Sequence, residues 1–166
     1  MNEKENIAEE IARNIEGIPL IYGYGCMASI AKRWRQQLNE NAKMLAFDFS
    51  LTECNHNEIE AWEGEIEGLT CIFLRGRENE EVNRRFEFMK KEYGRKAKII
   101  EYFAEGKREF TKMISCLYIG DYTSVYKAIM KDVNPLETRL IKELKKELST
   151  QDPHHSQSSE GLLSSL

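Results

Sequence analysis

The sequence predicts an α/β fold, a three-layer α-β-α sandwich built on a mostly parallel, doubly wound sheet. Short apolar runs alternate along the chain with longer segments of helical periodicity, which is the order of βαβ units. The apolar runs are nearly continuous, as expected of strands that helices cover on both faces. The length of 166 residues and the hydrophobic fraction of 41% suit one globular domain with a single core.

Two helices and two strands are expected in the first part of the chain. Apolar residues recur three or four positions apart over 3–16 and again over 28–38, which predicts a helix in each segment. Gly17 is placed to cap the first helix at its C-terminus. The apolar run over 18–22 predicts a buried strand, and a second strand is expected over 44–49.

The second part of the chain continues the same alternation. The clearest buried strand is expected over 69–74, and a fourth strand is expected over 97–102. The segment with helical spacing between residues 107 and 131 is either one long helix or two helices that break at Gly120-Asp121. With that segment included, the helices of this part are expected over 80–93, 107–131 and 136–148.

The periodic pattern stops after Ser149. Residues 150–166 are rich in serine and glutamine and lack both periods, so we expect a single domain over 1–149 followed by a disordered tail. His154 and His155 lie in this tail and are expected to be solvated histidines in preference to a weak metal site.

Charge and hydropathy exclude several classes of function. Acidic and basic residues are intermixed at a net charge of −4, so the basic stripe of a nucleic-acid-binding protein is absent from the sequence. No apolar run is long enough to span a membrane, and the charged, helical N-terminus does not have the pattern of a signal peptide. We therefore expect neither a nucleic acid nor a membrane as a partner.

The four cysteines form no C-x-x-C pair, which argues against a zinc site or any other metal centre and favours a reducing, cytoplasmic compartment. Cys71 and Cys116 lie inside apolar runs and are expected in the core. Cys54 lies two residues before His56, so a reactive thiol is an alternative there, although no further nucleophile signature accompanies it.

Three loops are expected to meet at one edge of the sheet because each follows a strand of a parallel sheet. They are Gly23–Cys26, Ser50–Glu58 and Arg75–Arg77. The first presents Gly23 and Gly25, which either bind an anion through backbone N–H groups at a helix N-terminus or simply form a tight turn. The two arginines of the third either bind an anion or lie in a solvated turn.

Glu40 and His56 are the candidate proton-transfer residues. Glu40 lies at the end of a helical segment, where the negative end of the helix dipole would raise the pKa of a carboxyl group and suit it to act as a base. His56 lies between Asn55 and Asn57, which can hold the imidazole in one tautomer. From the residues alone, an ordinary solvated glutamate and a surface histidine that caps the next turn are the favoured alternatives.

Several blocks of this sequence resemble a known family, in the same order. They are GIPLIYGYG, RWRQQLNENAKMLAF, ECNHNEIEAW, IFLRGRENEE and LYIGDYTSVYKAIMKDVNPLETRLIKELKKEL. The sequence is similar over Ile7 to Leu148 to the C-terminal sugar isomerase (SIS) domain of archaeal-type bifunctional phosphoglucose/phosphomannose isomerases. The NENAK and NHNE blocks are the most specific part of this resemblance.

The resemblance implies an isomerase that interconverts glucose 6-phosphate or mannose 6-phosphate with fructose 6-phosphate through an enediolate, without a metal or other cofactor. By the same resemblance Glu40 is the base, and His56 assists ring opening from the other subunit of a dimer. Lys145 also acts in ring opening, and Thr138 binds substrate seven residues before it. Lys142 and Lys146 are alternatives to Lys145 in the same lysine-rich segment.

The sequence departs from the family pattern in one respect, because the N-terminal SIS domain and its phosphate-binding Ser/Thr loops have no counterpart in it. Activity is therefore expected to need a complementary SIS-domain chain, in addition to the homodimer that the family implies. The alternatives are a non-catalytic module that binds a sugar phosphate and a structural dimerisation domain.

Overall fold

The computed structural model describes residues 6–150 of the chain. The chain divides into two compact units, one that ends at Pro135 and one that begins at Leu136. No helix within residues 6–150 combines the length and the apolar composition that a membrane span requires.

The first unit is built on a four-stranded, all-parallel sheet with the strand order β2-β1-β3-β4. The central strands are β1 (Ile18–Tyr24) and β3 (Leu69–Arg75), which pair with each other. The edge strands are β2 (Phe47–Leu51) beside β1 and β4 (Lys98–Phe103) beside β3. Only the two central strands are buried over most of their length, as their unbroken apolar runs predicted.

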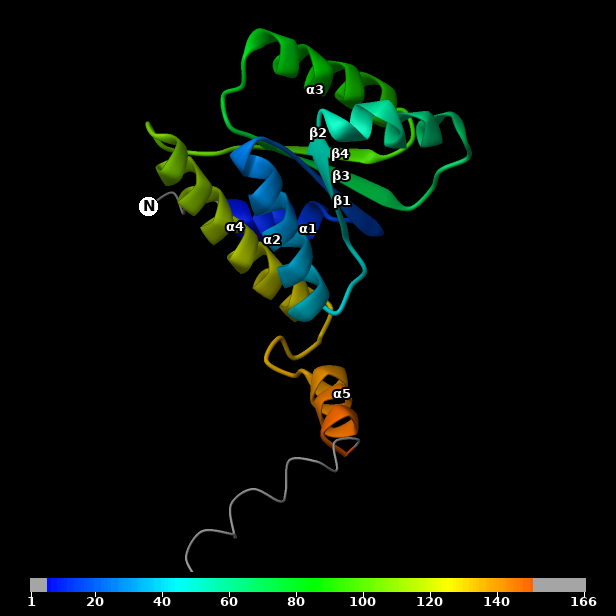
Figure 1. Cartoon of the computed structure of the whole chain (residues 1–166), viewed down its shortest axis with the longest axis vertical. Coiled ribbons are helices and arrows are strands. Elements are labelled where there is room, and N and C mark those ends of the chain that lie inside the picture. The colour runs from blue at the N-terminus through cyan, green and yellow to red at the C-terminus, as the bar shows by residue number, and fades with distance from the viewer. Residues whose placement is uncertain (1–5, 151–166) are drawn as a thin grey trace, which may run out of the picture. The chain divides into compact units, whose positions relative to one another are not determined.

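Helices cover both faces of this sheet (Figure 1). The helices α1 (Ile7–Asn14), α2 (Cys26–Glu40) and α4 (Glu109–Met130) pack on one face. The opposite face is covered by α3 (Glu80–Tyr93) and by two short 3₁₀ helices, η1 (Glu53–His56) and η2 (Glu58–Glu63). The predicted three-layer α/β sandwich is confirmed.

Alternation along the central strands divides the core between the two faces. Ile21 and Ile72 point toward α1, α2 and α4, whereas Tyr22 and Phe73, one residue further on, belong to the cluster under α3. All four side chains are fully buried. Two apolar layers of this kind hold the sheet rigid, so the loops at its ends start from fixed positions.

The segment over 107–131 forms one helix, α4, without a break at Gly120-Asp121. Gly120 is buried in the middle of the helix, where a Cβ atom would lie 2.2 Å from Nε1 of Trp34 on α2. The same indole nitrogen donates a hydrogen bond to the carbonyl of Cys116 at 2.9 Å. Asp121 accepts hydrogen bonds from Arg33 and Gln37 of α2. Gly120 and Asp121 therefore form the contact between α4 and α2, and the glycine allows the two helices to approach closely.

Two loop predictions need correction. Gly23 and Tyr24 continue strand β1 and pair with Ser50 and Leu51 of β2, so the turn after this strand is Gly25 alone. The polar segment over 52–58 is not an open loop, because it folds into η1 and the start of η2. Short-range hydrogen bonds, such as that from the N–H of Asn55 to the carbonyl of Thr52 at 3.2 Å, form these 3₁₀ turns without any apolar periodicity.

In the described part of the second unit, residues 136–150, the helix α5 (Arg139–Thr150) is amphipathic. The carbonyl of Thr138 accepts the hydrogen bond from the N–H of Lys142 at 3.0 Å, which places Thr138 at the start of the helix. The predicted domain boundary at residue 149 stays a prediction. The tail predicted after it lies, apart from Thr150, outside the described residues.

Candidate functional site

The loops that follow β1, β2 and β3 lie at one edge of the sheet, because the three strands are parallel and adjacent in register. At this carboxyl edge the chain passes from β1 through Gly25 into α2, from β2 into η1, and from β3 through Gly76 toward α3. These connections position the candidate residues of the sequence analysis, with the exceptions of Glu40 and α5.

Gly23, within β1, and Gly25, directly after it, each have a clear structural reason. A Cβ atom at Gly23 would lie 2.3 Å from the carbonyl oxygen of Met27, so only glycine lets α2 begin this close to the strand. Gly25 adopts a positive φ of 55° and precedes the first turn of α2 without any side-chain cap. A Cβ atom at Gly25 would meet nothing within 4 Å, so the approach to this turn is open. Substrate binding by Gly23 and Gly25 stays a prediction.

His56 is the last residue of η1, and its side chain is exposed at the carboxyl edge. The asparagines on either side are held by the protein. The carboxamide oxygen of Asn57 accepts from the N–H of Glu58 at 2.6 Å, and its nitrogen donates to Glu53 at 2.8 Å. Asn55 contacts the sulfur of Met89 at 3.3 Å. Asn57 therefore caps the next helix, and the hydrogen-bond partners of both amides are residues other than His56.

Glu58 is a residue that the sequence analysis passed over. Its carboxylate accepts hydrogen bonds from the hydroxyl groups of Tyr22 and Tyr93 at 2.6 and 2.9 Å, and from the indole N–H of Trp62 at 2.7 Å. Tyr22 and Tyr93 lie 36 and 35 residues away from Glu58 in the sequence, so no local pattern could predict these contacts. The only signal was the presence of Glu58 in the NHNE block itself.

Glu40 is the last residue of α2 and is exposed. Because α2 follows β1 and runs back along the sheet, it begins at the carboxyl edge and ends at the opposite, amino edge (Figure 1). Its 15 residues span about 22 Å at 1.5 Å per residue. Within one chain, Glu40 and His56 therefore lie at opposite edges of the sheet and cannot touch the same small molecule.

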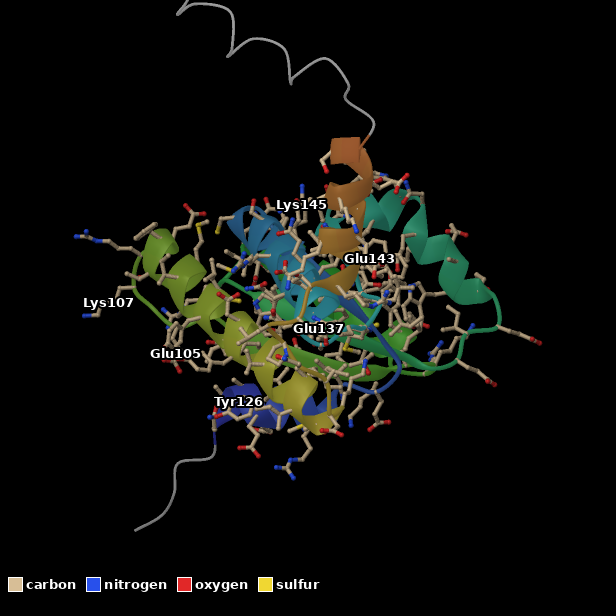
Figure 2. The ribbon with its side chains drawn as sticks, turned by 90° about the horizontal axis from the view of Figure 1, so that it is seen from below. Glu105, Lys107, Tyr126, Glu137, Glu143 and Lys145 are labelled. Carbon is tan, nitrogen blue, oxygen red and sulfur yellow. The ribbon has the colours of Figure 1, made fainter. Side chains whose placement is uncertain are left out.

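Lys145 lies on α5 with an exposed side chain (Figure 2). Four large apolar residues of this helix lie on one side and are exposed, namely Leu140, Ile141, Leu144 and Leu148. At about 100° per residue, Lys145 lies about 40° beyond Ile141 and borders this apolar side, whereas Lys142 and Lys146 lie on the opposite side. This difference favours Lys145 over the two alternative lysines if the apolar side packs against another surface. Its role and that of Thr138 stay predictions.

Arg75 is neither an anion site nor part of a solvated turn, so both interpretations of the sequence are wrong for this residue. It is only 2% exposed, and its guanidinium binds Glu101 at 2.6 Å and Glu78 at 3.3 Å. The guanidinium also lies 4.4 Å from the ring centre of Phe86. With its charge neutralised by these partly buried carboxylates, Arg75 forms a structural ion-pair cluster under α3. Arg77 is exposed, with a positive φ of 66°.

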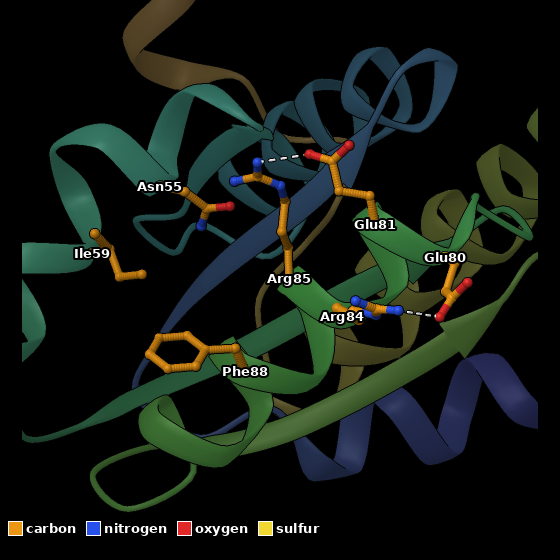
Figure 3. A pocket seen from close by; sticks show the side chains of 7 residues that line it. All are labelled: Asn55, Ile59, Glu80, Glu81, Arg84, Arg85 and Phe88. Carbon is orange, nitrogen blue, oxygen red and sulfur yellow. Dashed lines mark hydrogen bonds and ion pairs between the residues drawn. The ribbon is translucent and has the colours of Figure 1, made fainter.

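A cavity of about 570 Å³ lies between α3 and the 3₁₀ segment that carries His56 (Figure 3). Its two arginines pair with two glutamates one helical turn earlier, Arg85 with Glu81 at 2.8 Å and Arg84 with Glu80. The cavity therefore has no excess of positive charge for the phosphate of a sugar phosphate. Its lining consists of Asn55, Ile59, Glu80, Glu81, Arg84, Arg85 and Phe88.

The four cysteines are free thiols. Cys71 and Cys116 are fully buried, as predicted. Cys54 is also fully buried, and its burial raises the pKa of the thiol to about 12, so the alternative of a reactive thiolate is wrong. Among residues 6–150, no group of three or more histidine, cysteine, aspartate or glutamate side chains is arranged to hold a metal ion.

Comparison with known proteins gives consistent matches over nearly the whole chain. The family model described as "Bacterial phospho-glucose isomerase C-terminal SIS domain" matches residues 4–148. A bifunctional phosphoglucose/phosphomannose isomerase of Thermoplasma acidophilum is 33% identical over 147 residues, which cover 88% of this chain and 46% of that protein. The protein of the same name from Thermoplasma volcanium is 32% identical over 148 residues, which cover 89% and 48%.

Among solved structures, a glucose-6-phosphate isomerase-like protein from Thermus thermophilus superposes with a TM-score of 0.65 at 21% identity. The superposition covers 86% of this chain and 48% of that one, and at this identity it supports the fold alone. The chain thus spans about half the length of the curated relatives that it matches.

Proposed function

The chain belongs to the family of bacterial phospho-glucose isomerase C-terminal SIS domains, and from this membership we propose that it supplies one half of an aldose–ketose isomerase. The proposed reaction interconverts glucose 6-phosphate or mannose 6-phosphate with fructose 6-phosphate through an enediolate. The observation that carries the proposal is the alignment of bifunctional phosphoglucose/phosphomannose isomerases over 88–89% of this chain.

In the proposed mechanism, the carboxylate of Glu40 takes a proton from C2 of the open-chain aldose and returns it to C1. A single carboxylate is sufficient because the proton leaves and returns on the same face of the enediolate. The imidazole of His56 and the ammonium of Lys145 assist the opening of the sugar ring, with Thr138 binding substrate beside Lys145. The side chains of Glu40, His56 and Lys145 all need access to the substrate, and all three are exposed.

We propose that each active site is completed by a second copy of the chain. Glu40 and His56 lie at opposite edges of one sheet, so a site that holds both needs Glu40 from one copy and His56 from another. A pair of copies related by a two-fold axis would form two such sites. The separation of the two residues along α2 is the observation that supports a homodimer.

We also propose a complementary SIS half as a partner, since relatives are about twice as long as this chain. The outer side of α4 offers a surface for it. Exposed apolar side chains recur there about one turn apart, an unusual patch on a surface without a partner. They are Phe110, Ile114, Tyr118, Tyr122, Val125 and Ile129, called the α4 stripe below. The complementary half is proposed to cover this stripe and to supply the phosphate-binding loops. The four free thiols support a cytoplasmic location.

The test is an isomerase assay of the chain with the remaining half of a relative, such as the Thermoplasma acidophilum protein, supplied as a separate polypeptide. Turnover of glucose 6-phosphate or mannose 6-phosphate is expected, and Glu40→Gln should reduce kcat by at least about a hundredfold, as loss of a general base does. The matched control is Glu10→Gln, which changes an exposed glutamate on a different helix, α1. If the wild-type chain turned over no faster than Glu40→Gln, the proposed isomerase function would be refuted.

A non-catalytic sensor of sugar phosphates is the second candidate. Calorimetry separates the two functions, since a sensor binds glucose 6-phosphate while turnover stays at the background rate. Retention of a base and a ring-opening histidine in the NENAK and NHNE blocks favours the enzyme, because binding alone needs neither group.

A further inference from the structure

The carboxylate of Glu58 is bonded by three aromatic side chains from three different elements. Tyr22 comes from β1, Trp62 from η2 and Tyr93 from α3, with donor–acceptor distances of 2.6, 2.7 and 2.9 Å. Oε1 accepts two of these bonds and Oε2 accepts the third. Since both oxygens are engaged from inside the protein, Glu58 is not oriented to act on a substrate.

The three donors are themselves fixed by packing. The rings of Trp62 and Tyr93 stack at 3.9 Å with an interplanar angle of 8°, and Tyr22 lies 5.9 Å from Tyr93. Tyr22 and Tyr93 are fully buried, and Trp62 is 7% exposed. Burial and the neighbouring carboxylate raise the pKa of both phenols, so the hydroxyl groups stay protonated and remain donors. The two phenolic donors, on β1 and α3, are therefore held in place by packing.

Besides this anchor, the segment is tied to the rest of the chain by the contact of Asn55 with Met89 and by Lys96, which donates to the carbonyl of Trp62. It follows β2, a five-residue strand at the edge of the sheet, and it consists of 3₁₀ turns, whose hydrogen bonds have poorer geometry than those of α-helices. Cys54 and Trp62 are its buried side chains. His56 itself is exposed and lies two residues before Glu58, so its position depends on how the segment is held.

We propose that Glu58 is a positioning residue, which fastens the segment η1–η2 to the sheet and to α3 and thereby fixes His56 at the carboxyl edge. This inference rests on the proposed function for its catalytic consequence, but not for its structural one. Hydrogen bonds to an ionised carboxylate are stronger than neutral ones. Two of them join this short segment to β1 and α3, and the third, from Trp62, lies within η2 itself. The joint holds His56 without contacting the imidazole.

The experiment compares the variant Glu58→Gln with the wild-type chain and with Glu60→Gln, a change of an exposed glutamate on the same 3₁₀ helix. Amide hydrogen exchange is measured separately for residues 52–63 and for strand β3. We expect Glu58→Gln to speed exchange over 52–63 by about tenfold or more and to leave exchange in β3 unchanged. Glu60→Gln should alter neither region.

Unchanged exchange over 52–63 would overturn the proposal, and so would an equal acceleration in β3, which would show a general loss of stability. If Glu58→Gln does not fold, Tyr93→Phe removes one donor of the three, keeps the ring stack, and should give a smaller acceleration over the same residues. For Tyr93→Phe too, unchanged exchange over 52–63 or an equal acceleration in β3 would overturn the proposal.

Activity is the second measurement, with the complementary half supplied. Glu58→Gln is expected to lower kcat by about tenfold while KM stays within about twofold, because a displaced His56 affects ring opening more than substrate affinity. A rise in KM with kcat unchanged would refute the catalytic consequence. If the wild-type chain has no isomerase activity while exchange responds as expected, the proposed function fails and the anchoring role of Glu58 stands.

Discussion

Two inactive variants, Glu40→Gln and His56→Ala, are expected to restore activity to each other when they are mixed. If each site takes Glu40 from one copy and His56 from its partner, a mixed pair contains one site with both mutations and one site with neither. Equal amounts that exchange freely give half mixed pairs, each with one of two sites intact, so about a quarter of wild-type activity should return. If both residues came from the same chain, both sites of every mixed pair would be damaged and no activity would return.

The assay follows fructose 6-phosphate formation from glucose 6-phosphate after the variants have been incubated together with the complementary half. Native mass spectrometry of chains with different tags verifies that mixed pairs have formed. A mixture of two Glu40→Gln preparations is the control and should stay inactive. Mixed pairs that form in the expected proportion and yet show no activity above that of either parent would refute the shared site.

Three further predictions follow from particular contacts. Arg75→Met should lower the free energy of unfolding in urea by about 3–5 kcal/mol, because it leaves the carboxylate of Glu78 buried with the N–H of Gly76 but without a cation; a loss below about 1 kcal/mol would contradict the buried ion pair. Burial raises the pKa of the Cys54 thiol from 9.0 to about 12, so the folded chain holds this proton more tightly than the unfolded chain, and the contribution of Cys54 to stability should be complete below pH 9 and lost as the pH rises to 12. Urea titrations of wild type and Cys54→Ala across that range measure it, and parallel curves would contradict it. Ile114→Asp, in the middle of the α4 stripe, should weaken binding of the complementary half by at least about tenfold in a pull-down titration, whereas Ile7→Asp, at another exposed isoleucine, should not; equal affinities would show that the stripe is not the docking surface.

Sequence periodicity was sufficient where an element carries its own signals. The helix predicted over 80–93 coincides with α3 because Asn79 caps its start through the N–H of Val82, and Gly94 follows its end. Both signals are local, and so is the apolar stripe that the helix buries. The central strands β1 and β3 were found for a similar reason, since an unbroken apolar run records burial on both faces.

Periodicity was insufficient where a residue takes its role from distant partners. The motif Arg-Gly-Arg after a strand resembles a solvated turn, and only the pairing of β3 with β4 brings Glu101 to the guanidinium of Arg75. Gly120 was a plausible helix break until the approach of Trp34 gave it a packing role. Glu58 was one glutamate among many, because its tyrosine donors lie on other elements.

The two halves of the proposed site differ in how firmly the chain holds them. Glu40 ends a 15-residue helix, and the turn after it is tied to α4 by hydrogen bonds from Asn41 to Ser124 at 2.8 Å and from Lys131 to the carbonyl of Ala42 at 2.9 Å. His56 lies instead on 3₁₀ turns after an edge strand.

Proton transfer depends on geometry at the scale of about 1 Å, so the less restrained residue would limit the proposed site, to which two copies would contribute. The anchoring carboxylate next to the histidine meets this demand within the chain. The second copy then needs only to dock in the correct position as a rigid body, because its segment η1–η2 already holds His56 in place.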